Sequence, residues 1–332
     1  MLQKPIILTP GDPAGIGAEI SLKAWQQGCN DFVIFEDAAR LQSLANDFGM
    51  DIPITSLPNL GAYEPDSHAL QVMPISWDTA PIAGKPETAN APMVIEAIKD
   101  AASLVQAGQA AAMVTNPIAK ATLYESGFAY PGHTEFLGSL CTPDQGAPLM
   151  MLACDDLRVV PLTVHIPLAE VASNVTSEAI INACRLMARS LYRYEQVNDP
   201  HIAICGLNPH AGEQGTMGQE DATIIAPAIA ALRAENINVT GPHPADTLFH
   251  AEARSSYDAV LGMYHDQVLI PLKTIDFYGG VNITLGLDFI RTSPDHGTGF
   301  DIAGQGLAHP DSLIAAIKQA RRMASAHTGN AS

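Results

Sequence analysis

The sequence has few cysteines and few basic residues, and both shortages narrow the class of protein. Its five cysteines stand far apart without a Cys-x-x-Cys pair, which argues against a disulfide framework or a zinc ribbon and favours reduced, buried thiols. Lysine and arginine number 17 against 35 acidic residues, a formal net charge of −18. Because nucleic acids are bound through basic stripes, we expect no nucleic-acid partner.

Long apolar runs are also missing. No run approaches the roughly 18 residues of a membrane span. The chain reaches Pro10-Gly11 too early for a signal core of about 7–15 apolar residues. We therefore expect a cytoplasmic protein without a membrane partner. The 332 residues, 47% hydrophobic and 16% charged, are typical of a globular chain with two domains.

Short β-rich runs alternate with helical periodicity along the chain. Strands are predicted at residues 5–9, 31–35, 110–115, 157–162, 201–205 and 257–263. Helices are predicted from about residue 18 and at residues 38–48, 87–107, 177–194, 220–235 and 312–326. Residues 53–86 are expected to be rich in loops. This alternation predicts an α/β fold with a mainly parallel sheet covered by helices on both faces.

Three histidines follow predicted apolar strands. His165, His210 and His265 each stand just past such a run, and parallel sheets bind their ligands at the carboxyl ends of strands. Three neutral imidazoles suit a catalytic zinc or a related divalent ion. The alternative is that each imidazole only forms hydrogen bonds in its own loop. The spacing of the three residues leaves both interpretations open.

A glycine-bearing loop follows the first predicted strand and leads into a helix. Its residues Gly11, Asp12, Gly15 and Gly17 are candidates for an anion-binding loop. The loop matches neither the dinucleotide fingerprint Gly-x-Gly-x-x-Gly nor a phosphate-binding Walker loop. A tight turn that needs glycine backbone freedom explains it equally well.

Other polar residues are candidates for holding an anionic substrate. Residues 131–137 indicate a turn leading into a helix, where His133 and Thr134 would meet a phosphate, although Thr134 also suits a plain helix cap. Lys273, Asn282 and Arg291 lie about nine residues apart in a stretch poor in other basic residues, and surface solvation is the alternative for each.

Asp246 and Asp266 border the same loops as these candidates. Each is a weaker candidate for orienting ligands or moving protons.

Seven segments spread in order along the chain resemble one family, the 4-hydroxythreonine-4-phosphate dehydrogenases of vitamin B6 biosynthesis (the PdxA family). They are TPGDPAGIG (9–17), PGHTEF (131–136), GLNPHAGE (206–213), PADTLF (244–249), MYHDQ (263–267), NITLG (282–286) and IRTSPDHGT (290–298). Any one of them is weak evidence. The seven segments in series cover essentially the whole chain and are strong evidence for the family.

The resemblance implies roles for most of these candidates. One divalent metal ion per subunit (zinc, magnesium or cobalt) would be bound by His165, His210 and His265. The phosphorylated substrate would contact His133, Thr134, Lys273, Asn282 and Arg291. Residues 296–304 resemble an adenosine-binding loop, so NAD(P) is expected at His296, Gly297, Thr298 and Asp301.

The resemblance also implies an architecture. Family members are similar to isopropylmalate dehydrogenases, with a non-Rossmann α/β/α fold of two domains, an active-site cleft between the domains, and a homodimer that shares its active sites. We expect the first domain at residues 1–130 plus 291–332. The second, at 131–290, would carry the metal and dimer contacts.

The implied reaction is a metal-assisted oxidation of 4-phosphohydroxy-L-threonine by NAD(P), followed by decarboxylation. Asp246, Asp266 or a metal-bound water is expected to act as the base. The chain departs from many members at residues 114–120, at Ala18 and at Gly299, and the role of Lys120 stays open. Alternatives are a dehydrogenase of phosphorylated threonate or erythronate, a zinc hydrolase, and a catalytically idle binding protein.

Overall fold

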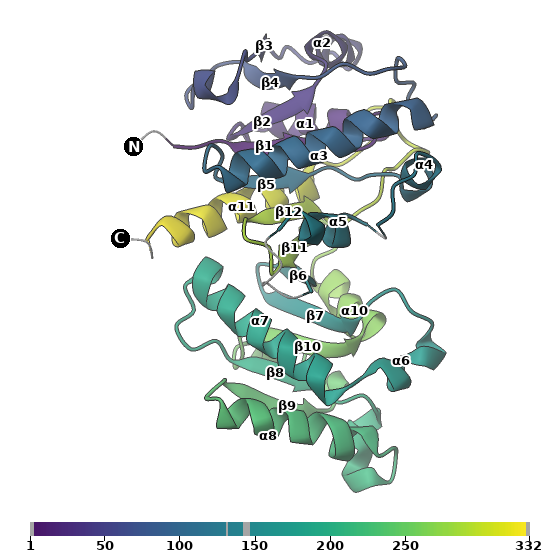
Figure 1. The fold of residues 1–332 in the computed structure, drawn as a ribbon, viewed down its shortest axis with the longest axis vertical. Helices are drawn as coiled ribbons and strands as arrows, with labels where there is room; N and C mark the ends of the chain where they lie inside the picture. The colour runs from purple at the N-terminus through teal and green to yellow at the C-terminus, as the bar shows by residue number, and fades with distance from the viewer. Residues whose placement is uncertain (1–2, 131, 142–146, 330–332) are drawn as a thin grey trace. The chain divides into compact units, whose positions relative to one another are not determined.

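A computed structural model of the chain describes residues 3–130, 132–141 and 147–329, and Figure 1 shows its elements. The chain forms two compact units. Unit 1 comprises Met1–Pro148 with Leu287–Ser325, and unit 2 comprises Leu149–Gly286 with Ala326–Ser332. Pro131, in one of the segments that carry the family resemblance, lies outside the described residues. None of the described helices is long and apolar enough to cross a membrane.

Unit 1 is built on parallel strands. They are β1 (Ile6–Thr9), β2 (Phe32–Glu36), β3 (Ile54–Ser56), β4 (Leu70–Pro74), β5 (Ala112–Thr115) and β12 (Arg291–Pro294), in the order β3-β4-β2-β1-β5-β12. The helices are α1 (Gly17–Gln26), α2 (Ala38–Asp47), α3 (Ala91–Gln106), α4 (Lys120–Glu125), α5 (His133–Ser139) and most of α11 (Asp311–Gly329).

The strands of unit 1 are buried on both faces. Ile7 on β1 packs in a cluster with Val94 and Ile98 of α3, which lies across β1 and β5 in Figure 1. Ile6 and Leu8 point to the opposite face and are just as fully buried. Burial on both faces explains why these strands are continuous apolar runs without alternation.

Unit 2 contains four adjacent parallel strands and an antiparallel edge. Its strands are β6 (Leu149–Cys154), β7 (Leu157–Thr163), β8 (Ile202–Cys205), β9 (Val239–His243), β10 (Ala259–Tyr264) and β11 (Val281–Leu285), in the order β11-β6-β7-β10-β8-β9. Its helices are α6 (Leu168–Asn174), α7 (Ser177–Glu195), α8 (Ala226–Ala234), α9 (Ala251–Arg254) and α10 (His265–Ile275). β6 is antiparallel to β7 and β11, whereas β7, β10, β8 and β9 run parallel.

Helix α10 is fixed on this sheet by an apolar stripe. Val268, Leu269 and Leu272 are buried in one cluster with Val159 of β7 and Val260 of β10. The spacing of the three helix residues places them on one helical face. Because the helix begins directly after β10, this packing fixes its first residue, His265, at the strand end.

The predicted α/β fold with a mainly parallel sheet is confirmed, and three local predictions need correction. Residues 53–86 contain the short strands β3 and β4. The helix predicted at 87–107 becomes a regular α-helix only at Ala91, with Pro92 in its first turn, where proline is tolerated. The helix predicted at 220–235 begins with a wide irregular turn, Asp221–Ile225, before α8.

Candidate active site

The three strand-end histidines occupy neighbouring positions in unit 2. His165 lies two residues after β7, His265 directly after β10, and His210 five residues after β8. These strands are adjacent and parallel in the order β7-β10-β8, so their carboxyl ends lie at one edge of the sheet. Asp246 follows the next parallel strand, β9.

Two of these imidazoles are close enough to share an ion. The ring centres of His165 and His265 lie 6.0 Å apart. Rings on one metal have centres roughly 5–6 Å apart, given metal–nitrogen bonds of about 2 Å. His265 Nδ1 is 2.7 Å from Asp266 Oδ1. A carboxylate only accepts hydrogen bonds, so Nδ1 carries the proton and Nε2 presents its lone pair. This pair therefore fits a metal site.

His210 stands on an unusual left-handed turn. Residues 210–214, which we call the His210 turn, have φ angles of 53°, 51°, 76°, 39° and 58°, and only Gly212 is a glycine. Left-handed backbone costs other residues about 1–2 kcal/mol each. Such strain concentrates at functional sites. Among the described residues, no group of three or more His, Cys, Asp or Glu already has metal-ligand geometry.

Hydrogen bonds join the strand ends that carry the histidines. Thr163 Oγ1 at the end of β7 donates to Met263 O on β10 at 2.8 Å. Gln267 on α10 accepts from Met263 N at 2.6 Å and donates to Gly206 O, past the end of β8, at 2.8 Å. Gly206 N in turn donates to His243 O on β9 at 2.7 Å. The four strand ends therefore form one hydrogen-bonded framework.

Both candidate bases line one cavity in unit 2. Asp246 and Asp266 share a cavity of about 490 Å³ with Tyr264, Gln267 and Thr274. Asp266 is already bonded to the imidazole of His265, as described above. Asp246 is exposed at the same cavity, without a role in that pair.

Lys273 and Asn282 also lie in unit 2. Lys273, near the end of α10, places its ammonium 5.6 Å from the ring centre of Phe277. Asn282 lies on β11, opposite Leu152 of β6. Its Oδ1 atom is buried and accepts no hydrogen bond from any described residue. A buried acceptor without a donor is rare in proteins, so this atom is suited to a ligand that donates.

Unit 1 buries an arginine next to a histidine. Arg291 on β12 is 3% exposed, and its Nε and Nη2 donate to Thr115 Oγ1 at 3.2 and 2.6 Å. Burial lowers the pKa of Arg291 to about 9. Burial, then the charges of Arg291 and Lys120, hold the pKa of His133 well below its ordinary value. His133 is therefore neutral at pH 7, and its buried Nε2 bonds to no described residue.

Lys120 brings a second cation to this group. It begins α4, after the loop that follows β5, and a Cβ on Gly132 would lie 3.5–3.6 Å from its Cε and Nζ. Helix α5 begins at His133 with Gly132 in the cap position, so Thr134 lies in the first turn and is not the cap. Arg291, Lys120 and His133 thus gather in unit 1, and we call them the anion-binding group because two cations beside a neutral imidazole would suit an anion.

The glycine-bearing loop after β1 owes its glycines to close packing. A Cβ would lie 2.6 Å from Pro117 O at Gly11, 2.7 Å from Thr298 O at Gly15, and 2.6 Å from Pro10 O at Gly17. These contacts support the tight-turn interpretation.

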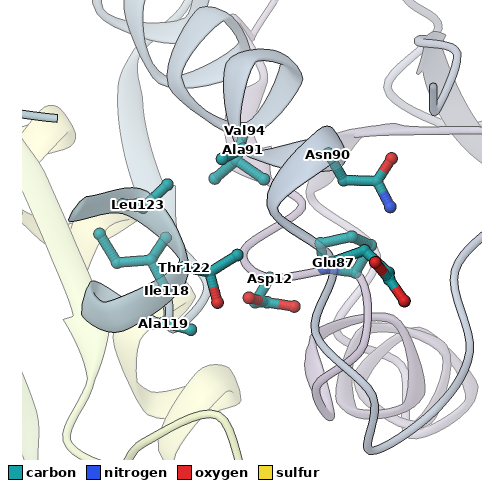
Figure 2. A pocket seen from close by; sticks show the side chains of 10 residues that line it. Asp12, Glu87, Asn90, Ala91, Val94, Ile118, Ala119, Thr122 and Leu123 are labelled. Carbon is teal, nitrogen blue, oxygen red and sulfur yellow. The ribbon is translucent and has the colours of Figure 1, made fainter. Parts of the chain in front are cut away.

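The carboxylate of Asp12 also argues against anion binding by this loop. Asp12 Oδ1 accepts from Ala14 N at 2.9 Å. Burial raises the pKa of Asp12. Its side chain and that of Thr122 turn toward a cavity of about 10 Å³, room for one water (Figure 2). A buried carboxylate at this position disfavours the binding of an anionic ligand.

The loop expected to bind the cofactor packs on this first loop. Ile16 N donates to Thr298 O at 2.9 Å. His296 Nδ1 lies 3.0 Å from Gly297 O, so the nitrogen donates and Nε2 is left as an acceptor in the neutral ring. That Nε2 is buried and bonds to no described residue, which suits an amino or hydroxyl group of a ligand.

Comparisons with known proteins identify the family. The family model for the pyridoxal phosphate biosynthetic protein PdxA matches residues 27–320. The chain belongs to the PdxA family. It is 49% identical to a 4-hydroxythreonine-4-phosphate dehydrogenase of Caulobacter vibrioides, over 98% of each chain. One from Xanthobacter autotrophicus is 47% identical, over 97% of this chain and 94% of that protein.

A solved PdxA-type structure matches the fold as well. The 4-hydroxythreonine-4-phosphate dehydrogenase of Klebsiella pneumoniae superposes with a TM-score of 0.89 at 36% identity. The match covers 97% of this chain and 98% of that one. The similarity therefore extends over both units of this PdxA-family chain.

Three residues around the site escaped the sequence reasoning. Thr115 orients Arg291, Gln267 joins two strand ends, and the buried Asp221 accepts hydrogen bonds from the backbone before His210. Only Gln267 stood in a recognised segment, beside His265. A polar residue at the carboxyl end of a buried strand was a usable signal for Thr115. Asp221 looked like an ordinary acidic residue near a helix start.

Proposed function

We propose that this PdxA-family chain is a 4-hydroxythreonine-4-phosphate dehydrogenase. It would oxidise 4-phosphohydroxy-L-threonine with NAD(P) to a 3-oxo acid, which loses CO₂ to give 3-amino-2-oxopropyl phosphate for pyridoxal 5'-phosphate synthesis. The observation that carries this proposal is 47–49% identity with proteins of that name over nearly the full length. Their name implies a nicotinamide cofactor as hydride acceptor.

His165, His210 and His265 are proposed to hold one divalent ion, zinc, magnesium or cobalt. When bound, the ion supplies Lewis-acid chemistry at the C3 hydroxyl of the substrate. The adjacent parallel strand ends and the 6.0 Å separation of two of the rings support this assignment. Asp266 would fix the tautomer of His265 through their 2.7 Å contact.

Asp246 is the better of the two candidate bases. Asp266 is engaged with His265, whereas Asp246 lines the same cavity and is exposed there. Asp246 would accept the proton of the C3 hydroxyl, and NAD(P), when bound, would supply the acceptor for the hydride from C3. The C3 ketone of the product would lie β to the carboxylate, so the C–CO₂ bond can break with release of CO₂. The enolate that remains would then take up a proton at C2 to give the ketone.

The anionic groups of the substrate are proposed to meet His133, Thr134, Lys120 and Arg291 of unit 1 and Lys273 and Asn282 of unit 2. A chain with a net charge of −18 has to supply positive charge locally to hold a phosphate. Arg291 and Lys120 provide two such charges beside His133. A neutral His133 contributes a directional hydrogen bond instead of a third charge.

The adenosine part of NAD(P) is proposed to lie at His296, Gly297, Thr298 and Asp301. The support is the buried acceptor His296 Nε2, which bonds to no described residue and suits the amino group of adenine. The hydrogen bond from Ile16 N to Thr298 O would hold this loop in shape.

We also propose that the protein is a homodimer that shares its active sites. Each chain would have the two-domain arrangement of isopropylmalate dehydrogenases, with a cleft between the domains. Unit 2 exposes apolar side chains at Ile270 and Phe277, which are 63% and 65% accessible. Ile270 borders the cavity of Asp246 and Asp266, so a second copy covering it would also cover the site. Ile270→Glu should then shift the protein to a monomer in light scattering and reduce turnover together.

The experiment is NADH formation from 4-phosphohydroxy-L-threonine by chelator-treated and metal-restored enzyme, with His210→Ala beside it. Metal-dependent turnover that is lost in His210→Ala supports the reaction and the metal site. Oxidation of phosphorylated threonate or erythronate instead would keep the family and overturn the substrate. Turnover without nicotinamide would indicate a hydrolase, and no turnover of any candidate would indicate a binding protein.

A further inference from the structure

We infer that Asp221 is a positioning residue that builds the His210 turn and so sets where the His210 imidazole stands. The inference rests on the proposed metal site and concerns a residue outside it. Asp221 is 2% exposed, and it lies eleven residues beyond His210, at the start of the irregular turn before α8.

The carboxylate of Asp221 accepts the hydrogen bonds that shape the chain just before His210. Leu207 N donates to its Oδ1 at 2.8 Å, and Asn208 N donates to its Oδ2 at 3.2 Å. The side-chain amide of Asn208 donates to the same Oδ2 at 2.8 Å. A carboxylate has two oxygens with about four lone-pair sites, so it can accept all three of these hydrogen bonds.

One glycine before the His210 turn and one within it make room for this carboxylate. A Cβ on Gly206 would lie 2.7 Å from Asp221 Oδ1, and one on Gly212 would lie 3.2 Å from Oδ2. The carboxylate is therefore wedged against the backbone both before and after His210. Because four residues of this turn adopt a left-handed backbone that their side chains disfavour, the turn needs such an external hold.

The same strand end is joined to the helix that carries His265. Gly206 O accepts from Gln267 Nε2 at 2.8 Å, and Gln267 lies on α10, two residues after His265. Asp221 fixes the chain from residue 206 to 212, and Gln267 ties that chain to α10. Asp221 thus controls the position of His210 relative to His265 without being a ligand itself.

The test compares metal affinity in Asp221→Asn, Asn208→Ala, Glu220→Gln and the wild-type protein. Asp221→Asn keeps the shape of the side chain but replaces one carboxylate oxygen with an NH₂ group, which cannot accept hydrogen bonds from the N–H donors. Asn208→Ala removes one of the three bonds. Glu220→Gln is the matched control, because Glu220 is the neighbouring carboxylate and also accepts from the Asn208 side chain, at 2.9 Å.

Zn²⁺ affinity is measured by competition with a chromophoric chelator, and Co²⁺ absorption reports the ligand geometry. We expect Asp221→Asn to bind Zn²⁺ roughly 10–100-fold more weakly and to change the Co²⁺ spectrum. Asn208→Ala should fall between it and the wild type, and Glu220→Gln should stay within about twofold. The KM for NAD, whose proposed site lies in unit 1, should not change.

Equal Zn²⁺ affinity in Asp221→Asn and the wild type overturns the inference, as does an equal loss in Glu220→Gln. If Asp221→Asn does not fold, Asn208→Ala decides, and wild-type affinity there overturns the inference. A wild-type protein that binds neither Zn²⁺ nor Co²⁺ overturns the metal site itself and this inference with it. Zn²⁺ binding by the wild type that weakens in Asp221→Asn but not in Glu220→Gln therefore supports both the metal site and the role of Asp221.

Discussion

Arg291 gives the sharpest test of the anion-binding group, because its charged side chain is almost completely buried. Its pKa falls from 12.5 to about 9 through burial. At about 1.4 kcal/mol for each pH unit, keeping this guanidinium charged costs about 5 kcal/mol. The bonds to Thr115 recover about 1.5–3 kcal/mol of that, since hydrogen bonds to charged groups contribute this much. About 2–3.5 kcal/mol of this cost is not offset by the bonds to Thr115.

The double variant Thr115→Val, Arg291→Met should therefore be more stable than the wild type. Replacing a buried charge and its partner by apolar groups of similar shape often raises stability by about 1–4 kcal/mol. We expect about 2 kcal/mol in the free energy of unfolding. Arg291→Met alone should gain less, because it leaves the Thr115 hydroxyl buried without this donor. Inorganic phosphate should stabilise the wild type and have no effect on the double variant.

The unfolding of unit 1 can be followed by tryptophan fluorescence. Its only two tryptophans, Trp25 and Trp77, both belong to that unit. Urea unfolding followed by tryptophan fluorescence thus reports the unit that contains Arg291. A double variant less stable than the wild type, at an unchanged slope with urea, would refute the reasoning. So would a double variant that phosphate still stabilises.

Three further predictions follow from the geometry. Folding depresses the pKa of His133 below 6.5. The contribution of His133 to the free energy of unfolding is therefore constant above pH 6.5, and stability is lost as the pH falls below 6.5. His133→Gln should remove up to about 1.4 kcal/mol of the loss between pH 7.5 and 5.5 in the same fluorescence assay. Ala211→Gly relieves a left-handed residue and should raise stability by about 0.5–1 kcal/mol in thermal unfolding, whereas Ala230→Gly in α8 should lower it by about 1 kcal/mol. Asp266→Asn should weaken Zn²⁺ binding roughly 10–100-fold in calorimetry, and unchanged affinity would show that Asp266 does not orient His265.

Much of the framework was predictable because it depends on local pattern. The apolar runs that became β1, β5, β7, β8 and β10 are continuous and end at polar or glycine-marked loops, so strand ends and the histidines after them followed directly. β3 and β4 were missed because they are short and lack a long periodic run. Their pairing with each other and with β2 depends on neighbours that local sequence does not specify.

The order of strands was the main unpredictable feature. Nothing in the sequence puts β10 between β7 and β8, yet this order gathers His165, His265 and His210 at one edge of the sheet. The His210 turn was equally hidden, since only Gly212 in it favours a left-handed backbone. The hold supplied by Asp221 comes from another part of the chain, so local propensity could not reveal it.

The separation of the three strand ends along the chain has a consequence for folding. His165 and His210 are 45 residues apart, and His210 and His265 are 55 apart (210 − 165 and 265 − 210), so an unfolded chain holds no short chelate among them. Closing such loops costs entropy, and an ion would find all three imidazoles only once β7, β10 and β8 have paired. It would then bind the native state alone, adding about 2.7 kcal/mol at a hundredfold excess over its dissociation constant. Unlike a small zinc domain, whose metal directs folding, this chain would acquire its ion after the sheet has formed.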